Sequence, residues 1–202
     1  MVVLLFGYEP FLEFSENPSM IIAQRLNGQK IKNHSIVSKI LPVDYSKVEK
    51  EITESIKLVN PDLVVGLGVA PGRSKITPEK IAINYKYSAA ADNSGSKPNG
   101  ELIDQTQSNG IFSTLPVETI VNTLSDSGIP SSLSLSAGGY LCNYAMFIIV
   151  RESLKSGVRG GFIHMPLHDN FVAKHPDMNY PSMDIKMIQD AIELSIKTSL
   201  PA

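Results

Sequence analysis

The amino-acid sequence predicts an α/β protein, a three-layer α/β/α sandwich around a mixed, largely parallel sheet. Short apolar runs typical of strands alternate along the chain with segments of helical periodicity. Two of these runs, residues 2–6 and 63–67, are almost wholly apolar, as expected of strands buried on both faces. Because the 202 residues contain no internal repeat and no low-complexity linker, we expect a single domain over residues 1–202.

The strands and the first two helices follow from local patterns. Asn17 and Pro18 are typical of an N-cap and a first helical turn. The second helix is expected to begin at Ser46, because Ser46 and Glu49 have the spacing of a capping box and apolar residues recur every fourth position from Val48. Strands are predicted at residues 2–6, 35–41, 63–67, 132–136 and 161–165.

Three further helices complete the alternation. One is predicted from Pro116 to Gly128, one over residues 141–155, and the last after Ser182. Residues 89–109 are polar and rich in Gly, Ser, Asn and Asp, which predicts a long surface loop.

The composition excludes several classes of protein. With 43% apolar and 19% charged residues, the chain is not disordered. A net charge of −2 provides no cationic field for nucleic acid or anionic lipid, and one cysteine cannot form an internal disulfide. The apolar runs are far shorter than the roughly 20 residues that cross a bilayer, and the first residues lack the features of a secretion signal. We therefore expect a cytoplasmic protein without nucleic-acid or membrane partners.

The single cysteine has a setting that suggests chemistry. Cys142 follows a glycine turn and precedes a helical run, so its thiol is expected near a helix N-terminus. Free N–H groups and the positive end of the helix dipole favour a thiolate there, and the same groups could hold an oxyanion. The alternative is a small buried apolar side chain without a catalytic role.

A nucleophilic thiol needs a base, and His164 is the best candidate. It lies near the end of an apparently buried strand, where the active sites of open α/β sheets gather, although it could also be a core histidine. His34 and His175 are expected at the surface. His164 and His168 are four residues apart, but Pro166 between them prevents the helix that would align two metal ligands. We therefore expect no metal site.

Glu79 is the candidate for the third group of a catalytic triad. It follows a glycine-rich segment and opens a run of alternating apolar residues, so its carboxylate could point into a cleft, although most glutamates face solvent. The segment 66–73 lacks the Lys-Ser/Thr of a phosphate loop. Residue patterns alone thus predict a possible thiol hydrolase and leave its substrate open.

A set of motifs, in order along most of the chain, resembles the type I pyroglutamyl peptidases, also called pyrrolidone-carboxylate peptidases. These motifs are GYEPF at residues 7–11, NPS at 17–19, LPV at 41–43, GLGVAPGR at 66–73, IAIN at 81–84, FSTLP at 112–116, GIP at 128–130, SAGGYLCN at 136–143, GFIHMP at 161–166 and PSM at 181–183. Each motif is weakly specific, but so many in the same order identify the chain as a member of this family.

The resemblance implies roles for individual residues. Cys142 would be the nucleophile, His164 the general base and then acid, and Glu79 the group that orients His164. The reaction would be hydrolysis of the bond after an N-terminal pyroglutamyl residue of a peptide, through an acyl-enzyme and without metal or organic cofactor. Three residues would line the pocket for the lactam ring, and relatives commonly form homotetramers. These lining residues are Tyr8, Phe11 and Leu141.

The chain departs from the family pattern at three places. Ala89 replaces an arginine that is thought to stabilise the oxyanion or shape the pocket, and Arg73 or Lys86 could supply the missing cation. Residues 12–13 replace a glycine pair, which implies another conformation of that loop, and Val69 stands where some relatives have glutamine. Two alternatives to an active peptidase therefore remain. One is a relative that binds pyroglutamyl peptides with little turnover, and the other is a thiol amidohydrolase acting on another lactam or acyl-amide.

Overall fold

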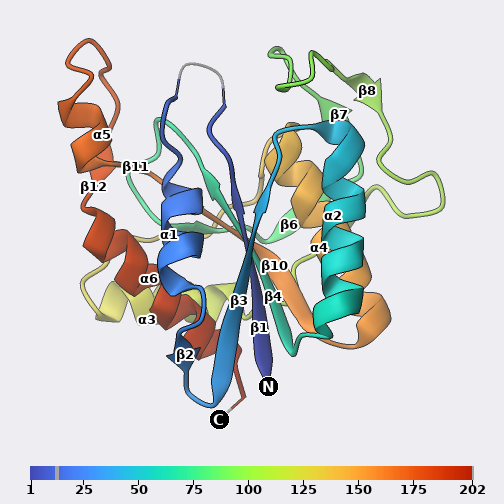
Figure 1. The fold of residues 1–202 in the computed structure, drawn as a ribbon, viewed down its shortest axis with the longest axis horizontal. Helices are drawn as coiled ribbons and strands as arrows, with labels where there is room; N and C mark the ends of the chain where they lie inside the picture. The colour runs from blue at the N-terminus through green and yellow to red at the C-terminus, as the bar shows by residue number, and fades with distance from the viewer. Residues whose placement is uncertain (12–13, 202) are drawn as a thin grey trace.

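A six-stranded sheet forms the centre of a computed structural model of the chain, which describes residues 1–11 and 14–201 (Figure 1). Its inner pairs, β3–β1, β1–β4 and β4–β10, are parallel, whereas β2 and β5 join the two edges antiparallel. The predicted mixed, largely parallel sheet is therefore confirmed. Across the sheet the strands are β2 (Lys30–Ile31), β3 (His34–Leu41), β1 (Val2–Tyr8), β4 (Leu63–Val69), β10 (Arg159–Met165) and β5 (Thr77–Pro78).

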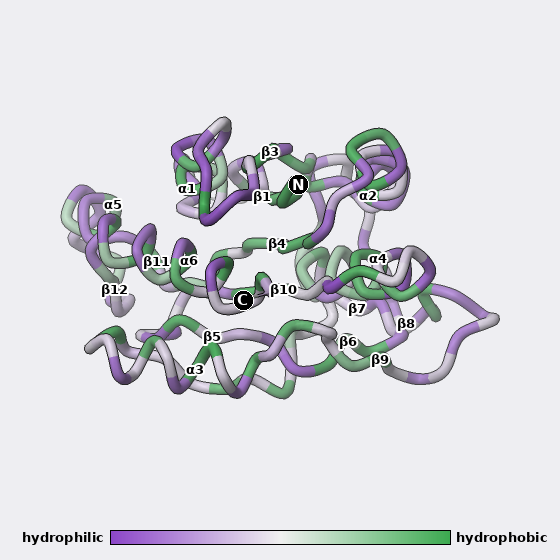
Figure 2. The backbone as a smooth tube through the Cα atoms, turned by 90° about the horizontal axis from the view of Figure 1, so that it is seen from below, coloured by the Kyte–Doolittle hydropathy of each residue, from purple (hydrophilic) through white to green (hydrophobic). Residues whose placement is uncertain are grey.

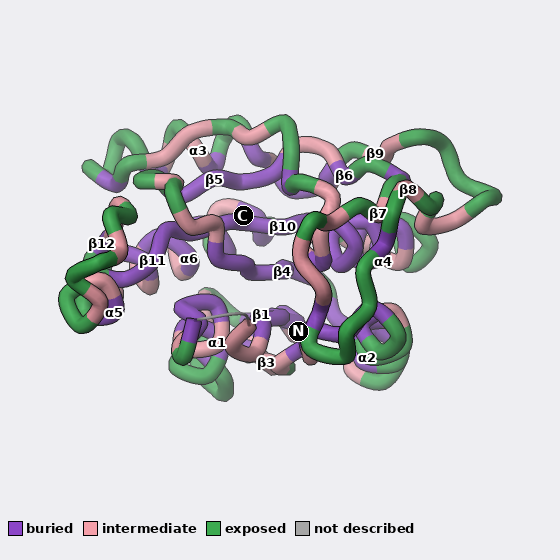
Figure 3. Tube along the Cα trace, turned by 90° about the horizontal axis from the view of Figure 1, so that it is seen from above, coloured by how far each residue is buried: buried purple, intermediate pink, exposed green. Residues whose placement is uncertain are grey.

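Helices cover both faces of the sheet. The end-on view places α1, α3 and α6 on one side and α2 and α4 on the other (Figure 2). Each side has its own apolar cluster against the sheet, and β1, β4 and β10 lie buried between them (Figure 3). This arrangement is the predicted three-layer sandwich. The helices are α1 (Pro18–Leu26), α2 (Tyr45–Val59), α3 (Val117–Asp126), α4 (Leu141–Ser156), α5 (Asp169–Ala173) and α6 (Ile185–Ser199).

Three small two-stranded sheets lie outside the main one. They join β6 (Ile81–Ile83) to β9 (Gly110–Phe112), β7 (Lys86–Tyr87) to β8 (Asn99–Glu101), and β11 (Leu167–His168) to β12 (Ser182–Met183). Among the described residues, no helix is long and apolar enough to span a membrane.

The predicted strand at residues 132–136 is wrong. Isolated bridges join this segment to its neighbour without forming a strand: Glu79 with Ser134 and, one residue before the segment, Ile76 with Ser131. The edge of the sheet is formed instead by β5, two residues long, one of which is a proline. A strand this short has no periodicity to detect. A proline is tolerated there because the backbone of an edge strand need not donate hydrogen bonds on its outer side.

The start of α2 also differs from the prediction. Its N-cap is Asp44, whose Oδ1 accepts hydrogen bonds from the backbone N–H of Ser46 at 2.9 Å and from its hydroxyl at 2.6 Å. Glu49, expected to close a capping box, instead accepts a hydrogen bond from Arg151 at 2.6 Å. The predicted cap at Asn17 is confirmed, because its side chain accepts from the N–H of Ser19 at 3.0 Å.

The polar stretch 89–109 is fastened to the body of the protein, although much of it is exposed. It contains β8, which pairs with β7, and its Asp104 receives a hydrogen bond from Arg151 in α4 at 3.0 Å. The same guanidinium also binds Glu49 in α2 and Glu152 in α4. Arg151 therefore connects the loop to both helices on that face.

Candidate active site

The candidate nucleophile lies at the first turn of α4. Tyr140 is the N-cap residue and Cys142 is the second helical residue, as the sequence predicted. Within the described residues, the N-cap side chain makes no capping hydrogen bond, so the first backbone N–H groups are available to bind an anion next to the thiol. The parallel strands β1, β4 and β10 end at the same edge of the sheet, and this turn lies beside them.

His164 and Glu79 are in direct contact inside the protein. Nδ1 of His164 lies 2.7 Å from Oε1 of Glu79, and the two side chains are 4% and 0% exposed. Since an ionised carboxylate only accepts hydrogen bonds, Nδ1 carries the proton and Nε2 is left free to accept one. Glu79 is held in place by its own backbone N–H, which donates to the carbonyl of Phe162 in β10 at 2.9 Å.

Strand register brings the thiol to the same place as the imidazole. Gly68 in β4 is the direct neighbour of His164 in β10, and in a parallel pair such neighbours project to the same face. A Cβ at Gly68 would lie only 3.0 Å from Sγ of Cys142. The sulfur therefore occupies the space that a side chain at Gly68 would fill, beside the imidazole of His164.

The thiol of Cys142 is protonated in this arrangement. Burial, together with the negative charge of Glu79, raises its pKa to about 12, although the positive charge of Arg73 acts in the opposite direction. Burial therefore acts against the thiolate that the sequence analysis expects at a helix N-terminus. Burial also lowers the pKa of His164, against the opposing effect of Glu79. The resting pair is consequently a neutral thiol beside a neutral imidazole, which can act as a general base.

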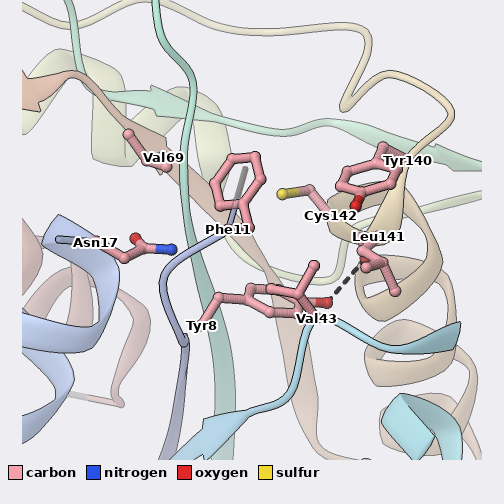
Figure 4. A pocket seen from close by; sticks show the side chains of 8 residues that line it. All are labelled: Tyr8, Phe11, Asn17, Val43, Val69, Tyr140, Leu141 and Cys142. Atoms are coloured by element: carbon pink, nitrogen blue, oxygen red, sulfur yellow. Dashed lines mark hydrogen bonds between the residues drawn. The ribbon is translucent and has the colours of Figure 1, made fainter. Parts of the chain in front are cut away.

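An apolar pocket opens next to the sulfur (Figure 4). The hydroxyl of Tyr8 donates to the carbonyl of Leu141 at 2.9 Å, and the amide of Asn17 is engaged by the carbonyl of Glu9 and by Ser19. The polar groups of these two lining residues are thus already used within the protein. The pocket is lined by Tyr8, Phe11, Asn17, Val43, Val69, Tyr140, Leu141 and Cys142.

All three residues expected to line a lactam pocket border this one. The sequence analysis missed Val43 and Tyr140, although both stand within or beside the quoted motifs. Val69 also lines the pocket, so the side chain that replaces the glutamine of some relatives is apolar and faces the space beside the thiol.

The other histidines lie away from the site. His168 caps α5, where its Nδ1 accepts the N–H of Phe171 at 3.3 Å, and its Nε2 lies 3.0 Å from Glu16 without the geometry of a hydrogen bond. His175 stacks on Phe171. His34, expected at the surface, is buried and only 5% exposed. Within residues 1–11 and 14–201, no three potential ligands gather to hold a metal ion.

The departures from the family pattern have different structural settings. Ala89 is exposed on the surface loop, and Lys86 lies over the ring of Tyr144, with 5.7 Å between Nζ and the ring centre. Arg73 binds Glu79, with 2.7 Å between Nη1 and Oε1. Of the two cations considered as replacements for the missing arginine, Arg73 thus contacts the triad. Residues 12–13 lie outside the described part of the chain.

Comparisons with known proteins show the family of the chain. The family model described as pyroglutamyl peptidase matches residues 1–201. A pyrrolidone-carboxylate peptidase of Saccharolobus islandicus is 53% identical over 98% of this chain and 94% of that protein, and one of Halalkalibacterium halodurans is 38% identical over 97% and 98%. The solved structure of pyrrolidone carboxyl peptidase from Pyrococcus furiosus superposes with a TM-score of 0.95, at 34% identity and 98% coverage of both chains. The chain is thus a member of the pyroglutamyl peptidase family.

Proposed function

We propose that this enzyme removes an N-terminal pyroglutamyl residue from peptides, with Cys142 as nucleophile, His164 as general base and acid, and Glu79 as the group that orients His164. The observation that carries the proposal is the 2.7 Å contact between His164 and Glu79 next to a thiol at an uncapped helix N-terminus. Nucleophile, base and orienting group are the set that acyl transfer requires.

The reaction begins with transfer of the thiol proton to Nε2 of His164 as Sγ attacks the pyroglutamyl carbonyl carbon. The carbonyl oxygen becomes an oxyanion, which the free N–H groups at the start of α4 stabilise. As the carbon–nitrogen bond breaks, the imidazolium gives its proton to the leaving amine, and an acyl-enzyme remains. A water molecule, deprotonated by His164, then releases pyroglutamate and restores the thiol. The steps need no metal or organic cofactor.

Specificity is explained by the chemistry of the pocket. A pyroglutamyl ring is small, flat and uncharged, which suits an apolar lining such as Tyr8, Phe11 and Leu141. A free N-terminal glutamate would bring an ammonium and a carboxylate into the same space unpaired, at a cost of about several kcal/mol.

We also propose one domain over residues 1–202, a cytoplasmic location and a homotetramer. Large apolar side chains remain exposed on one protomer, among them Leu135 at 68% and Phe112 at 64%, and assembly would cover such surface. A monomer in light scattering at micromolar concentration would contradict the tetramer.

The first experiment measures release of aminomethylcoumarin from its pyroglutamyl derivative. Activity should vanish in Cys142→Ala and after thiol alkylation, and should survive a chelator. Two buried histidines provide a matched pair, because His164→Ala should abolish turnover whereas His168→Ala should retain it. An inactive wild type that still binds pyroglutamate would instead support a binding relative. Turnover of other lactams or acyl-amides, but not of the pyroglutamyl derivative, would support a different amidohydrolase.

A further inference from the structure

The side chain of Arg73 joins two segments of the active site. Its Nη1 donates to Oε1 of Glu79 and to the hydroxyl of Thr77, both at 2.7 Å, and its Nη2 donates to the carbonyl of Ser136 at 3.0 Å. Glu79 and Thr77 belong to the edge segment of the sheet, whereas Ser136 opens the turn that leads to Cys142.

The carboxylate of Glu79 lies between Arg73 and His164. Oε1 receives both Nη1 of Arg73 and Nδ1 of His164, while Oε2 has no hydrogen-bond partner among the described residues. The side chain of Glu79 is fully buried and that of Arg73 is 31% exposed, so the guanidinium closes the site from the solvent side. Without it, the buried carboxylate would lose a fully charged partner.

We propose that Arg73 is a positioning residue, whose guanidinium fastens the carboxylate that orients His164 to the turn that carries Cys142. The argument rests on the proposed function of these three residues. A planar guanidinium suits the task, since it can donate in several fixed directions at once and stays charged at all relevant pH values.

The charge of Arg73 also balances that of Glu79 at the reacting atoms. Glu79 raises the pKa of both Cys142 and His164, and Arg73 lowers both. With Arg73 in place, Glu79 can therefore orient the imidazole while the pKa of the Cys142 thiol is raised less strongly. Removal of Arg73 should raise the pKa of both groups.

The test compares the wild type with Arg73→Gln and Arg73→Lys, and uses Arg159→Gln as control. Arg159 donates to the carbonyl of Ser199 at 2.6 Å and is not part of the site. Two quantities are measured across pH, kcat/KM for the pyroglutamyl substrate and the rate at which iodoacetamide alkylates Cys142. Arg73→Gln should lower kcat/KM by about 10- to 100-fold, the range seen for outer partners of functional histidines. It should also move the acid limb of the pH profile of kcat/KM to higher pH. At a fixed pH, it should slow the alkylation of Cys142 several-fold.

Arg73→Lys separates charge from geometry. A lysine keeps the charge but cannot donate as a planar fork, so kcat/KM should fall while the acid limb stays near that of the wild type. In a Glu79→Gln background, Arg73→Gln should lower kcat/KM by a smaller factor than it does in the wild type, because the carboxylate that Arg73 fastens is gone.

The proposal would be overturned if Arg73→Gln left both the acid limb of the kcat/KM profile and the alkylation rate unchanged. It would also be overturned if Arg159→Gln shifted the acid limb equally, or if Arg73→Gln lowered kcat/KM as much in the Glu79→Gln background as in the wild type. If Arg73→Gln does not fold, Arg73→Lys provides the test. Full activity of Arg73→Lys would refute the positioning role of Arg73. Failure of the proposed function is a separate result. A wild type inactive on the pyroglutamyl substrate would refute that function, and the alkylation rates would still test Arg73.

Discussion

Gly68 is the position where one added methyl group should separate catalysis from stability. Its Cβ in Gly68→Ala would lie 3.0 Å from Sγ of Cys142 and 2.8 Å from Cε1 of Phe162. Carbon atoms normally pack at about 3.5–4.0 Å, so the sulfur and the ring must each move by roughly 0.5–1 Å. A misplacement of about 1 Å can cost about 100-fold in rate, and overpacking costs about 1–3 kcal/mol of stability. We expect kcat/KM to fall by about 100-fold.

Gly66→Ala is the matched control. Its Cβ would clash with Cδ2 of the same Phe162 ring and lie 2.7 Å from Cε2 and 2.9 Å from Cδ1 of Ile149, and the sulfur is not among its nearest contacts. Urea denaturation should show at least as large a loss of unfolding free energy in Gly66→Ala as in Gly68→Ala, whereas the coumarin assay should show the larger loss of kcat/KM in Gly68→Ala. Activity of Gly68→Ala within threefold of the wild type, or equal losses in the two variants, would refute the placement of the thiol above Gly68.

Three further predictions concern the surface loop, a helix cap and the pocket. Ala89→Arg should change kcat/KM by less than about threefold, because Ala89 is exposed and free N–H groups already serve the oxyanion; a gain near 100-fold would show that the missing arginine matters. Asp44→Ala should lower the unfolding free energy by about 1 kcal/mol at pH 7. The hydrogen bond from Lys47 and those from Ser46 depress the pKa of Asp44 to about 2, so its contribution is full above about pH 4 and should disappear as pH falls through 2 in urea titrations. Tyr8→Phe removes the hydrogen bond to Leu141 and should cost about 1 kcal/mol of stability while KM changes less than about threefold, since that hydroxyl is already engaged; a tenfold rise in KM would assign it to substrate binding.

Periodicity predicted the parts of the fold that depend on long, buried patterns. The apolar runs in β1 and β4 and the helical repeat of α2 are visible in the sequence because each buries a regular face. Short elements gave no such signal. The two residues of β5 form an edge only because β10 lies beside them, and Ser46 and Asp44 are both acceptable caps until the backbone shows which of them precedes the helix.

The candidate site was predictable to a similar extent. Cys142, His164 and Glu79 are far apart in sequence, yet each stands at the end or start of a recognisable element, and family motifs identify all three. The contact of Arg73 with Glu79 could not be predicted, because no local sequence pattern shows whether an arginine binds a buried carboxylate or faces solvent. His34 shows the same difficulty, since a polar neighbourhood in sequence did not prevent its burial in space.

The three-way contact of Arg151 has a consequence for how a protease would treat this protein. Because β7 pairs with β8 and Asp104 anchors the polar loop just after β8, the exposed stretch 93–97 between these two strands is held at both ends. A cut there would leave two fragments that remain associated through the shared sheet and helices. The chain could then run as two bands under denaturing conditions and still elute as one species under native conditions.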